Sequence, residues 1–160
     1  MSETKSYCTF HLDGLFFGIE VFQIQEVLLY QDMTRVPLAP DMVRGLINLR
    51  GQIVTAFDLR RRLELPPLPE GELPMNVVVK DEDSLVSLLV DEIGDVVDVD
   101  ETTFEAPPEN VKGLARELTT GVYKLEGRLL LILDLAKVMQ LPGHASRKAS
   151  PELEASRSVA

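Results

Sequence analysis

The side chains that most often carry catalysis or bind metals are few and scattered in this sequence. Histidine occurs only as His11 and His144, and Cys8 is the single cysteine. A zinc site needs three or four such ligands, and a nucleophilic site needs a cysteine or serine paired with a base. These three residues complete neither arrangement. The sequence therefore predicts no catalytic residue, no metal site and no cofactor, and we expect that the protein is not an enzyme.

The acidic run DEIGDVVDVDE at 91–101 is a second place where chemistry could occur, because carboxylates bind calcium. Its spacing does not match the D-x-D-x-D-G calcium loop, and Asp98 and Asp100 alternate with valines as on a strand with one solvent-facing side. The phosphate-binding loops GxxxxGK[ST] and GxGxxG are also absent from the sequence. The acidic run is therefore predicted to be a solvated strand face.

Composition restricts the class of partner. The chain has 160 residues, a net charge of −10 and an isoelectric point near 4.6, so nucleic acid and anionic lipid would be repelled. The N-terminus is polar, and no apolar run approaches the length of a membrane span. We expect a cytoplasmic protein with protein partners, no nucleic acid and no direct insertion into a membrane.

The chain repeats itself. Residues 43–59 are VRGLINLRGQIVTAFDL and residues 119–135 are TTGVYKLEGRLLLILDL, with glycines, leucines and an aspartate in matching places. Two copies are too few for a solenoid, so two small β units that share one core are the better interpretation. The second copy carries extra residues at roughly 115–120. Shorter blocks recur in the same order, 16–27 with 85–96 and 40–46 with 108–114.

Turn residues predict where the hairpins lie. Asp13-Gly14, Arg50-Gly51 and Glu126-Gly127 fit two-residue turns, in which glycine supplies a positive φ. Residues 50 and 126 should therefore project from hairpin tips. The strand 23–29 alternates, which places Ile24, Glu26 and Leu28 on one face. We also expect one helical turn from Pro40 to Gly45, and the same device in the second copy ending at Gly113.

The strands that follow the repeated hairpins, 52–57 and 128–133, are apolar at nearly every position. Both of their faces should therefore be covered, one filling a barrel and the other the seam between barrels. Asp58 and Asp134 are placed to cap the short helices that come next. The proline-rich segment 66–74 is predicted to be a connector, and the polar tail 142–160 is predicted to be disordered.

The motifs resemble the CheW family of bacterial chemotaxis coupling proteins over roughly 6–141. The resemblance rests on VRGLINLRGQIVTAFDLRRRL at 43–63, with IEVFQIQEV before it and VDEIGDVVDV after it. It implies a mainly β domain of two SH3-like five-stranded β-barrel subdomains with short helices, packed across a shared hydrophobic core. The subdomains are expected at roughly 6–65 and 75–141, with possible strand or helix exchange between them.

The resemblance also implies an adaptor function. One surface would bind the regulatory domain of a CheA-type histidine kinase, and another the cytoplasmic tips of methyl-accepting chemotaxis receptors at membrane-associated arrays. The kinase-binding residues are left unassigned, with loops of the first barrel as the expected place. Glu92 stands where the family pattern has glycine, which would add bulk and charge near the receptor groove. The positions carried over for receptor binding are Ile24, Glu26, Arg50, Val77, Ile93 and Val96.

Two alternatives stay open. The protein could couple receptors to a kinase that controls an output other than flagellar swimming, and no residue separates this from ordinary chemotaxis. It could also be a small-ligand sensor on the same fold. That second alternative needs polar groups in the seam between the barrels, where the apolar strands 52–57 and 128–133 leave little room.

Overall fold

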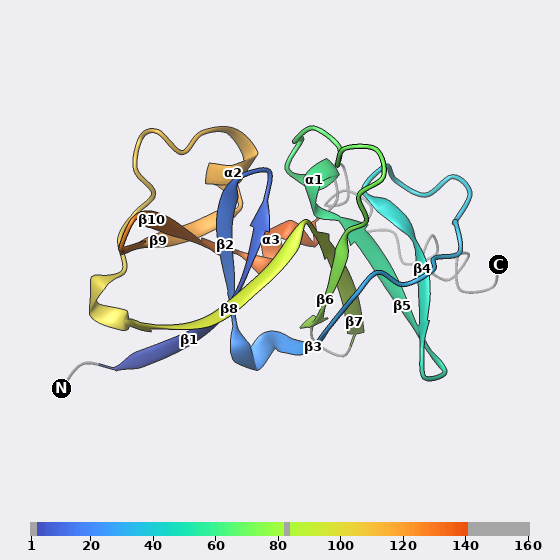
Figure 1. The fold of residues 1–160 in the computed structure, drawn as a ribbon, viewed down its shortest axis with the longest axis horizontal. Coiled ribbons are helices and arrows are strands. Elements are labelled where there is room, and N and C mark those ends of the chain that lie inside the picture. The colour runs from blue at the N-terminus through green and yellow to red at the C-terminus, as the bar shows by residue number, and fades with distance from the viewer. Residues whose placement is uncertain (1–2, 82–83, 141–160) are drawn as a thin grey trace, which may run out of the picture.

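The computed structural model describes residues 3–81 and 84–140, and within them the chain forms two five-stranded sheets with a few short helices (Figure 1). The mainly β prediction is confirmed. The strands are β1 (Thr4–Leu12), β2 (Leu15–Glu20), β3 (Ile24–Leu28), β4 (Val43–Leu49), β5 (Gln52–Asp58), β6 (Met75–Asp81), β7 (Ser84–Val90), β8 (Glu92–Asp100), β9 (Thr119–Leu125) and β10 (Arg128–Leu133). The helices are α1 (Leu59–Arg62), α2 (Gly113–Glu117) and α3 (Leu135–Val138), with the 3-10 turns η1 (Val21–Gln23) and η2 (Glu101–Thr103).

Each sheet takes strands from both sides of the connector 66–74. The first sheet has the order β8-β1-β2-β10-β9 and the second has the order β3-β6-β7-β5-β4. The hairpin β1–β2 thus completes the sheet of β8 to β10, and the hairpin β6–β7 completes the sheet of β3 to β5. A division at 6–65 and 75–141 does not coincide with the sheets. The parallel pairs β2–β10 and β5–β7 join the exchanged hairpins to their sheets.

The sheets are curled but not closed, which corrects the expectation of barrels. At one edge of each sheet, β4 and β9, the chain that precedes the strand folds back along it instead. Thr34 exchanges two backbone hydrogen bonds with Leu46 of β4, at 2.9 and 2.8 Å, and Glu105 does the same with Val122 of β9, at 2.9 and 2.7 Å. A sheet edge that is already paired in this way is not free to meet the opposite edge.

The close approach of Thr34 to β4 and of Glu105 to β9 explains two of the repeated glycines. A Cβ atom on Gly45 would lie 2.6 Å from the carbonyl oxygen of Thr34, and one on Gly121 would lie 2.7 Å from that of Glu105. Neither distance is tolerated by a real side chain. Glycine therefore recurs because β4 and β9 are each approached closely by the segment that precedes them.

Three apolar clusters fill the molecule. Along β10, Leu130 and Ile132 face a small cluster inside the first sheet, while Leu131 and Leu133 face the large core shared by both sheets. On β5, Val54 and Ala56 likewise lie in the cluster of the second sheet, and Phe57 lies in the shared core. The prediction that these strands are covered on both faces is confirmed for β10, but on β5 it fails at Ile53, whose side is open enough to leave that residue 59% exposed.

Caps and turns agree with the sequence except at two prolines. Asp58 accepts a hydrogen bond from the Arg61 backbone nitrogen at 3.2 Å, and Asp134 accepts one from that of Lys137 at 3.2 Å, as predicted. The helical turns expected after Pro40 and Pro108 are wrong. Each is a tight turn closed by one hydrogen bond, from Val43 at 2.9 Å and from Val111 at 3.1 Å. In the second copy, part of the extra sequence forms α2.

Two arginines on α1 tie the sheets together, a feature that sequence reasoning missed. Arg60 is buried and donates to both carboxylate oxygens of Asp91, at 2.7 and 2.6 Å, and Asp91 also accepts from the backbone nitrogen of Asp13 at 2.8 Å. Arg62 donates to the carbonyl oxygens of Val138 at 2.9 Å and Lys137 at 2.8 Å on α3. Helix α1 of the second sheet is thereby bonded to the first.

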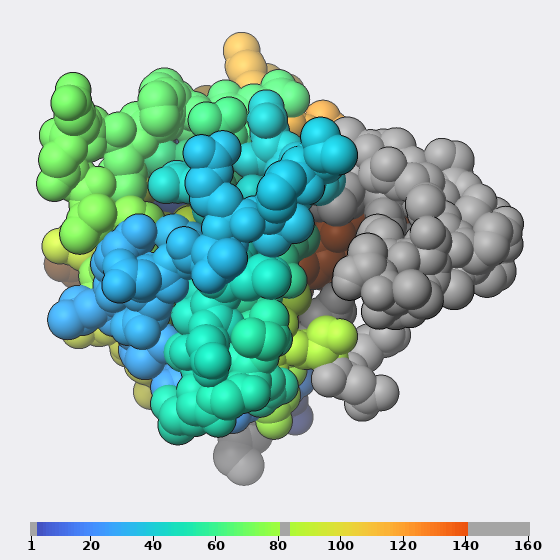
Figure 2. All heavy atoms as spheres, turned by 90° about the vertical axis from the view of Figure 1, so that its right-hand side faces the viewer, coloured from blue at the N-terminus to red at the C-terminus, as the bar shows by residue number. Residues whose placement is uncertain are grey.

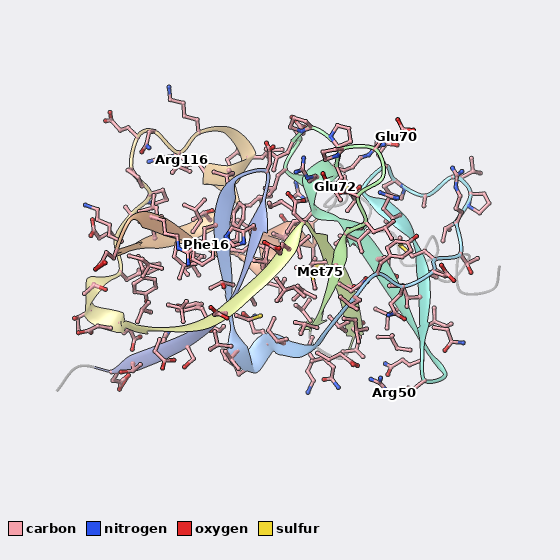
Figure 3. The ribbon with its side chains drawn as sticks, viewed as in Figure 1. Phe16, Arg50, Glu70, Glu72, Met75 and Arg116 are labelled. Carbon is pink, nitrogen blue, oxygen red and sulfur yellow. The ribbon has the colours of Figure 1, made fainter. Side chains whose placement is uncertain are left out.

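The remaining predictions concern single segments. Residues 66–74 contain neither helix nor strand, and Glu70 and Glu72 lie in this connector at the top of the view in Figure 3. Cys8 is buried, and burial raises the pKa of its thiol. Within 3–81 and 84–140, no helix is long and apolar enough to cross a membrane. The predicted disordered tail 142–160 lies outside the described residues.

Candidate partner-binding site

Two edge strands flank the seam between the sheets. β3 is an edge of the second sheet, β8 is an edge of the first, and β8 also contacts β6 beside β3 (Figure 1). Ile24 on β3 and Ile93 on β8 are half-buried and pack against the shared core, in which Val77 of β6 is fully buried. Three of the predicted receptor-binding residues therefore meet at one core.

Apolar side chains are also exposed on both edge strands. Val96 on β8 is 60% exposed and pairs with Cys8, which shares a face of β1 with the core residue Phe10. Val27 on β3 is 43% exposed and pairs with the core residue Val77. Directly opposed residues in a sheet share a face, so both valines extend the apolar surface of the seam into solvent.

The predicted common face of Ile24 and Glu26 is wrong. Ile24 pairs with Val79, which lies in the shared core, whereas Glu26 pairs with Val78, which lies in the cluster of the second sheet. A β-bulge between Ile24 and Glu26 inserts one residue and reverses the alternation. Ile24 therefore shares its face with Val27, and Glu26 lies on the other side of the sheet.

Glu26 is instead joined to Arg50 at the tip of the β4–β5 hairpin, labelled in Figure 3. The hairpin turn has positive φ at both Arg50 (+50°) and Gly51 (+88°), as a type I′ turn requires, and Asn48 Oδ1 accepts from the Gly51 nitrogen at 2.8 Å. The guanidinium of Arg50 forms an ion pair with the carboxylate of Glu26, across the open end of the curled second sheet. The Arg50 side chain stays 70% exposed.

The equivalent tip of the second copy differs in shape and charge. Its turn residues are Glu126 and Gly127, of which only Gly127 has a positive φ. Glu126 forms no ion pair with any residue that the structure describes. The two hairpin tips occupy equivalent places in the two copies. Only the first tip carries an exposed cation, Arg50, which is paired with Glu26.

The six predicted residues thus fall into two groups. Ile24, Val77, Ile93 and Val96 lie about the seam, and Glu26 and Arg50 form a polar pair on the other face of β3. Sequence reasoning missed Val27, because strict alternation assigned it to the wrong face. Phe22 in η1, next to β3 and exposed, was also missed, and no repeat or motif marked it.

Metal-binding geometry is absent from the described parts of the chain: no three His, Cys, Asp or Glu side chains there come close enough to hold an ion. His11 Nδ1 is buried without a hydrogen-bond partner, and its distance of 4.0 Å from Glu92 Oε1 is too long for one. Glu92, expected to add bulk and charge near the groove, begins β8 with an exposed side chain.

Comparisons with known proteins show the class of protein to which this chain is similar. The crystal structure of scaffolding protein TtCheW from Thermoanaerobacter tengcongensis aligns with a TM-score of 0.78 and 25% identity, covering 89% of this chain and 92% of that one. The chemotaxis protein CheW of Bacillus subtilis is 34% identical over 89% of this chain and 90% of its own length. That of Treponema pallidum is 30% identical over 81% of this chain and 79% of its own length.

A model of the CheW-like domain matches residues 6–142. The chain belongs to the CheW-like domain family.

Proposed function

We propose that this protein is a non-catalytic adaptor that couples methyl-accepting chemoreceptors to a CheA-type histidine kinase in a bacterial chemosensory array. Family membership supports the adaptor class, since the matched relatives are named as chemotaxis and scaffolding proteins. The observation that carries the receptor half of the proposal is the seam, where exposed Val27 and Val96 continue an apolar core outward.

The seam suits the side of a helix from a receptor tip. Burying apolar surface is worth about 25 cal/mol per Å², so a helix that covers both exposed valines gains affinity without any change in the core beneath them. A partner helix in an apolar groove is an established mode of recognition. Receptor conformation would then bias the kinase through contacts that differ between receptor states.

Arg50 provides the polar part of this contact. Exposed ion pairs contribute little to folding stability, typically below about 1 kcal/mol, so Arg50 can exchange Glu26 for a receptor carboxylate at small cost. A guanidinium is well suited to this because it binds carboxylates in a bidentate way. In this role Glu26 holds the arginine in place before the receptor binds.

We infer a cytoplasmic protein recruited to membrane arrays through its receptors. The alternative of a different pathway output stays open. The alternative of a ligand sensor gains no support from the buried polar groups between the sheets, because Arg60 is bonded to Asp91 and Arg62 to carbonyl oxygens of α3. The direct test is to mix the purified protein with the kinase regulatory domain and with receptor-tip fragments from the same organism. Binding to both is expected, and failure to bind either one would overturn the proposal.

A further inference from the structure

The loop between β3 and β4 contains Leu38, an exposed leucine whose side chain adds no packing to the fold. Residues 36–39 form a turn in which the Ala39 nitrogen donates to the Val36 oxygen at 3.3 Å, with Pro37 second and Leu38 third. Leu38 has a φ of +66° and is 104% exposed. A turn with proline second and a positive φ third usually takes glycine or asparagine at the third position. Leucine there costs backbone strain and packs against nothing.

This loop is well anchored on both sides of the turn. Thr34 is bonded to Leu46, Met33 packs against the cluster of the second sheet, and the Val43 nitrogen donates to the Pro40 oxygen at 2.9 Å. The strained leucine is therefore presented by a fixed segment rather than a free one. Val36, two residues before Leu38, is also 38% exposed, so the fixed turn presents two neighbouring apolar side chains, and contiguous exposed apolar patches mark binding sites on soluble proteins.

Three arginines surround the same loop. Arg35, Arg44 and Arg61 line a hollow of about 410 Å³ together with Leu38 and a single carboxylate, that of Asp41. Arg44 is paired with Asp58 at 3.1 Å and Arg61 with Asp41 at 3.6 Å, so Arg35 supplies an excess positive charge on a chain whose net charge is −10. Arg35 makes no ion pair with a described residue. This local positive charge favours a partner that presents carboxylates.

The second copy has no such surface. Five residues, 35–39, separate Thr34 from the turn-forming Pro40, whereas two residues separate Glu105 from Pro108. Just before that shorter loop, Phe104 packs on Tyr123, with ring centroids 5.2 Å apart. The leucine turn and Arg35 are additions to the first copy alone, whereas Lys112 and Lys137 stand in the second copy where Arg44 and Arg61 stand in the first.

We propose that Leu38, Arg35, Arg44 and Arg61, here termed the loop surface, form the docking site for an acidic, apolar patch of the kinase regulatory domain. This inference rests on the proposed adaptor function. A coupler must hold two proteins at once, so its second partner needs a surface apart from the hairpin tip. Figure 2 shows residues 29–44, coloured blue to cyan, across the middle and upper part of one face, while Arg50 lies at the far end of the hairpin in Figure 3.

Two variants test the loop surface in the full-length protein. Leu38→Asn removes the apolar contact and suits the positive φ, so its melting temperature should equal or exceed that of the parent. Arg35→Glu reverses one unpaired charge. Each should weaken binding of the purified kinase regulatory domain about tenfold or more in calorimetric titrations, and leave binding of a receptor-tip fragment unchanged. The parent affinity for the kinase domain should also fall as salt is raised.

Two control variants separate the loss of a specific contact with the kinase domain from general effects of substitution and net charge. Leu38→Met keeps an apolar side chain in the same turn and should retain kinase-domain binding. Lys112→Glu makes the same change in net charge at an exposed position outside the loop surface and should also retain it.

Each result of these binding experiments bears on a particular proposal. Folded Leu38→Asn and Arg35→Glu variants that bind the kinase domain as the parent does would overturn the loop surface while leaving the adaptor proposal intact. Loss of receptor binding alone would also overturn it, because the loop surface would then belong to the receptor site. A parent protein that binds neither partner would overturn both proposals.

Discussion

Arg50 and Glu126 occupy the same place in two related hairpins, and they differ where most of the repeat agrees. The glycines, apolar strands and capping aspartates agree between the copies because both halves fold in the same way. Only Arg50 reaches back to a carboxylate of its own sheet, at Glu26. The sequence comparison identified the tip difference, but not the ion pair, because a bulge within β3 hid the side on which Glu26 lies.

Replacing Arg50 by alanine should weaken receptor binding about tenfold while changing the free energy of unfolding by less than about 0.5 kcal/mol. The reason is that an exposed arginine at a hairpin tip contributes little to the fold and much to a polar contact. Titration of a receptor-tip fragment and urea denaturation measure the two effects. Glu126→Ala is the matched control, and we expect it to bind receptor as the parent does.

A charge exchange separates two roles for Arg50. In the Glu26→Arg, Arg50→Glu double variant the ion pair is kept but its direction is reversed. If Arg50 itself contacts the receptor, binding stays weak in the double variant. Recovery of parent affinity would show instead that the pair acts only by holding β3 and the hairpin together.

Close approaches between backbone segments determine how the strands are arranged. Gly45 and Gly121 occupy matching places in the repeat, but the turn role predicted for Gly14, Gly51 and Gly127 does not apply to them. They lie within strands and are needed because a carbonyl oxygen approaches where Cβ would be. Such tertiary crossings leave no local pattern, which is why the sequence predicted closed barrels and the structure has open, curled sheets.

Gly45→Ala should destabilise the protein by about 1–3 kcal/mol, because the added Cβ would lie 2.6 Å from the backbone oxygen of Thr34. Gly18→Ala is the comparison, since its nearest contact is the Leu130 Cδ1 atom at 3.1 Å, which can move. Chemical denaturation of both variants gives the difference. If Gly45→Ala lowers the free energy of unfolding no more than Gly18→Ala does, the close approach of Thr34 to β4 is contradicted.

The ion pair between Arg60 of α1 and Asp91, which lies between β7 and β8, predicts that folding stability depends on pH. Burial alone would raise the pKa of Asp91, but the hydrogen bonds from Arg60 and from the Asp13 backbone nitrogen outweigh burial, so the pKa lies below its ordinary value of 3.8. A carboxylate with a lowered pKa stabilises the fold fully above its unfolded pKa, and this contribution is lost as pH falls through the folded pKa.

Asp91→Asn should therefore cost about 2–3 kcal/mol of folding stability at pH 7, since it leaves a buried guanidinium without its carboxylate. The cost should shrink as the pH falls from 3.8 through the lower folded pKa of Asp91, because the parent carboxylate then becomes protonated as well. Urea denaturation at about pH 7 and across this acid range measures the change. Glu92→Gln, a neighbouring change at an exposed side chain, is expected to show neither effect. A cost that does not vary with pH would contradict the ion pair.

On the scale of the whole molecule, the two halves of the sequence are interlocked. Repetition and apolar strands predicted two small β units that share one core, and the family resemblance added that each unit has five strands. The sequence left open which strands pair across the connector, because a repeat relates positions along the chain and not hydrogen-bond partners. The structure places β1 and β2 with the strands of the second half, and β6 and β7 with those of the first.

Interlocking predicts that neither half folds alone. A protein with a protease site inserted between Glu70 and Gly71 should stay folded and associated after cleavage, as judged by gel filtration and circular dichroism. The separately expressed halves should be unfolded, since each lacks strands of both sheets. A soluble, folded half that melts cooperatively would contradict the exchange of strands.

The central claim is that one molecule joins a receptor and a kinase through separate surfaces. The most direct measurement is sedimentation of the purified protein with the kinase regulatory domain and a receptor-tip fragment, alone and together. The account predicts a single complex that contains all three components, and loss of only the receptor from it when Arg50 is replaced by alanine. Displacement of one partner by the other would contradict the account.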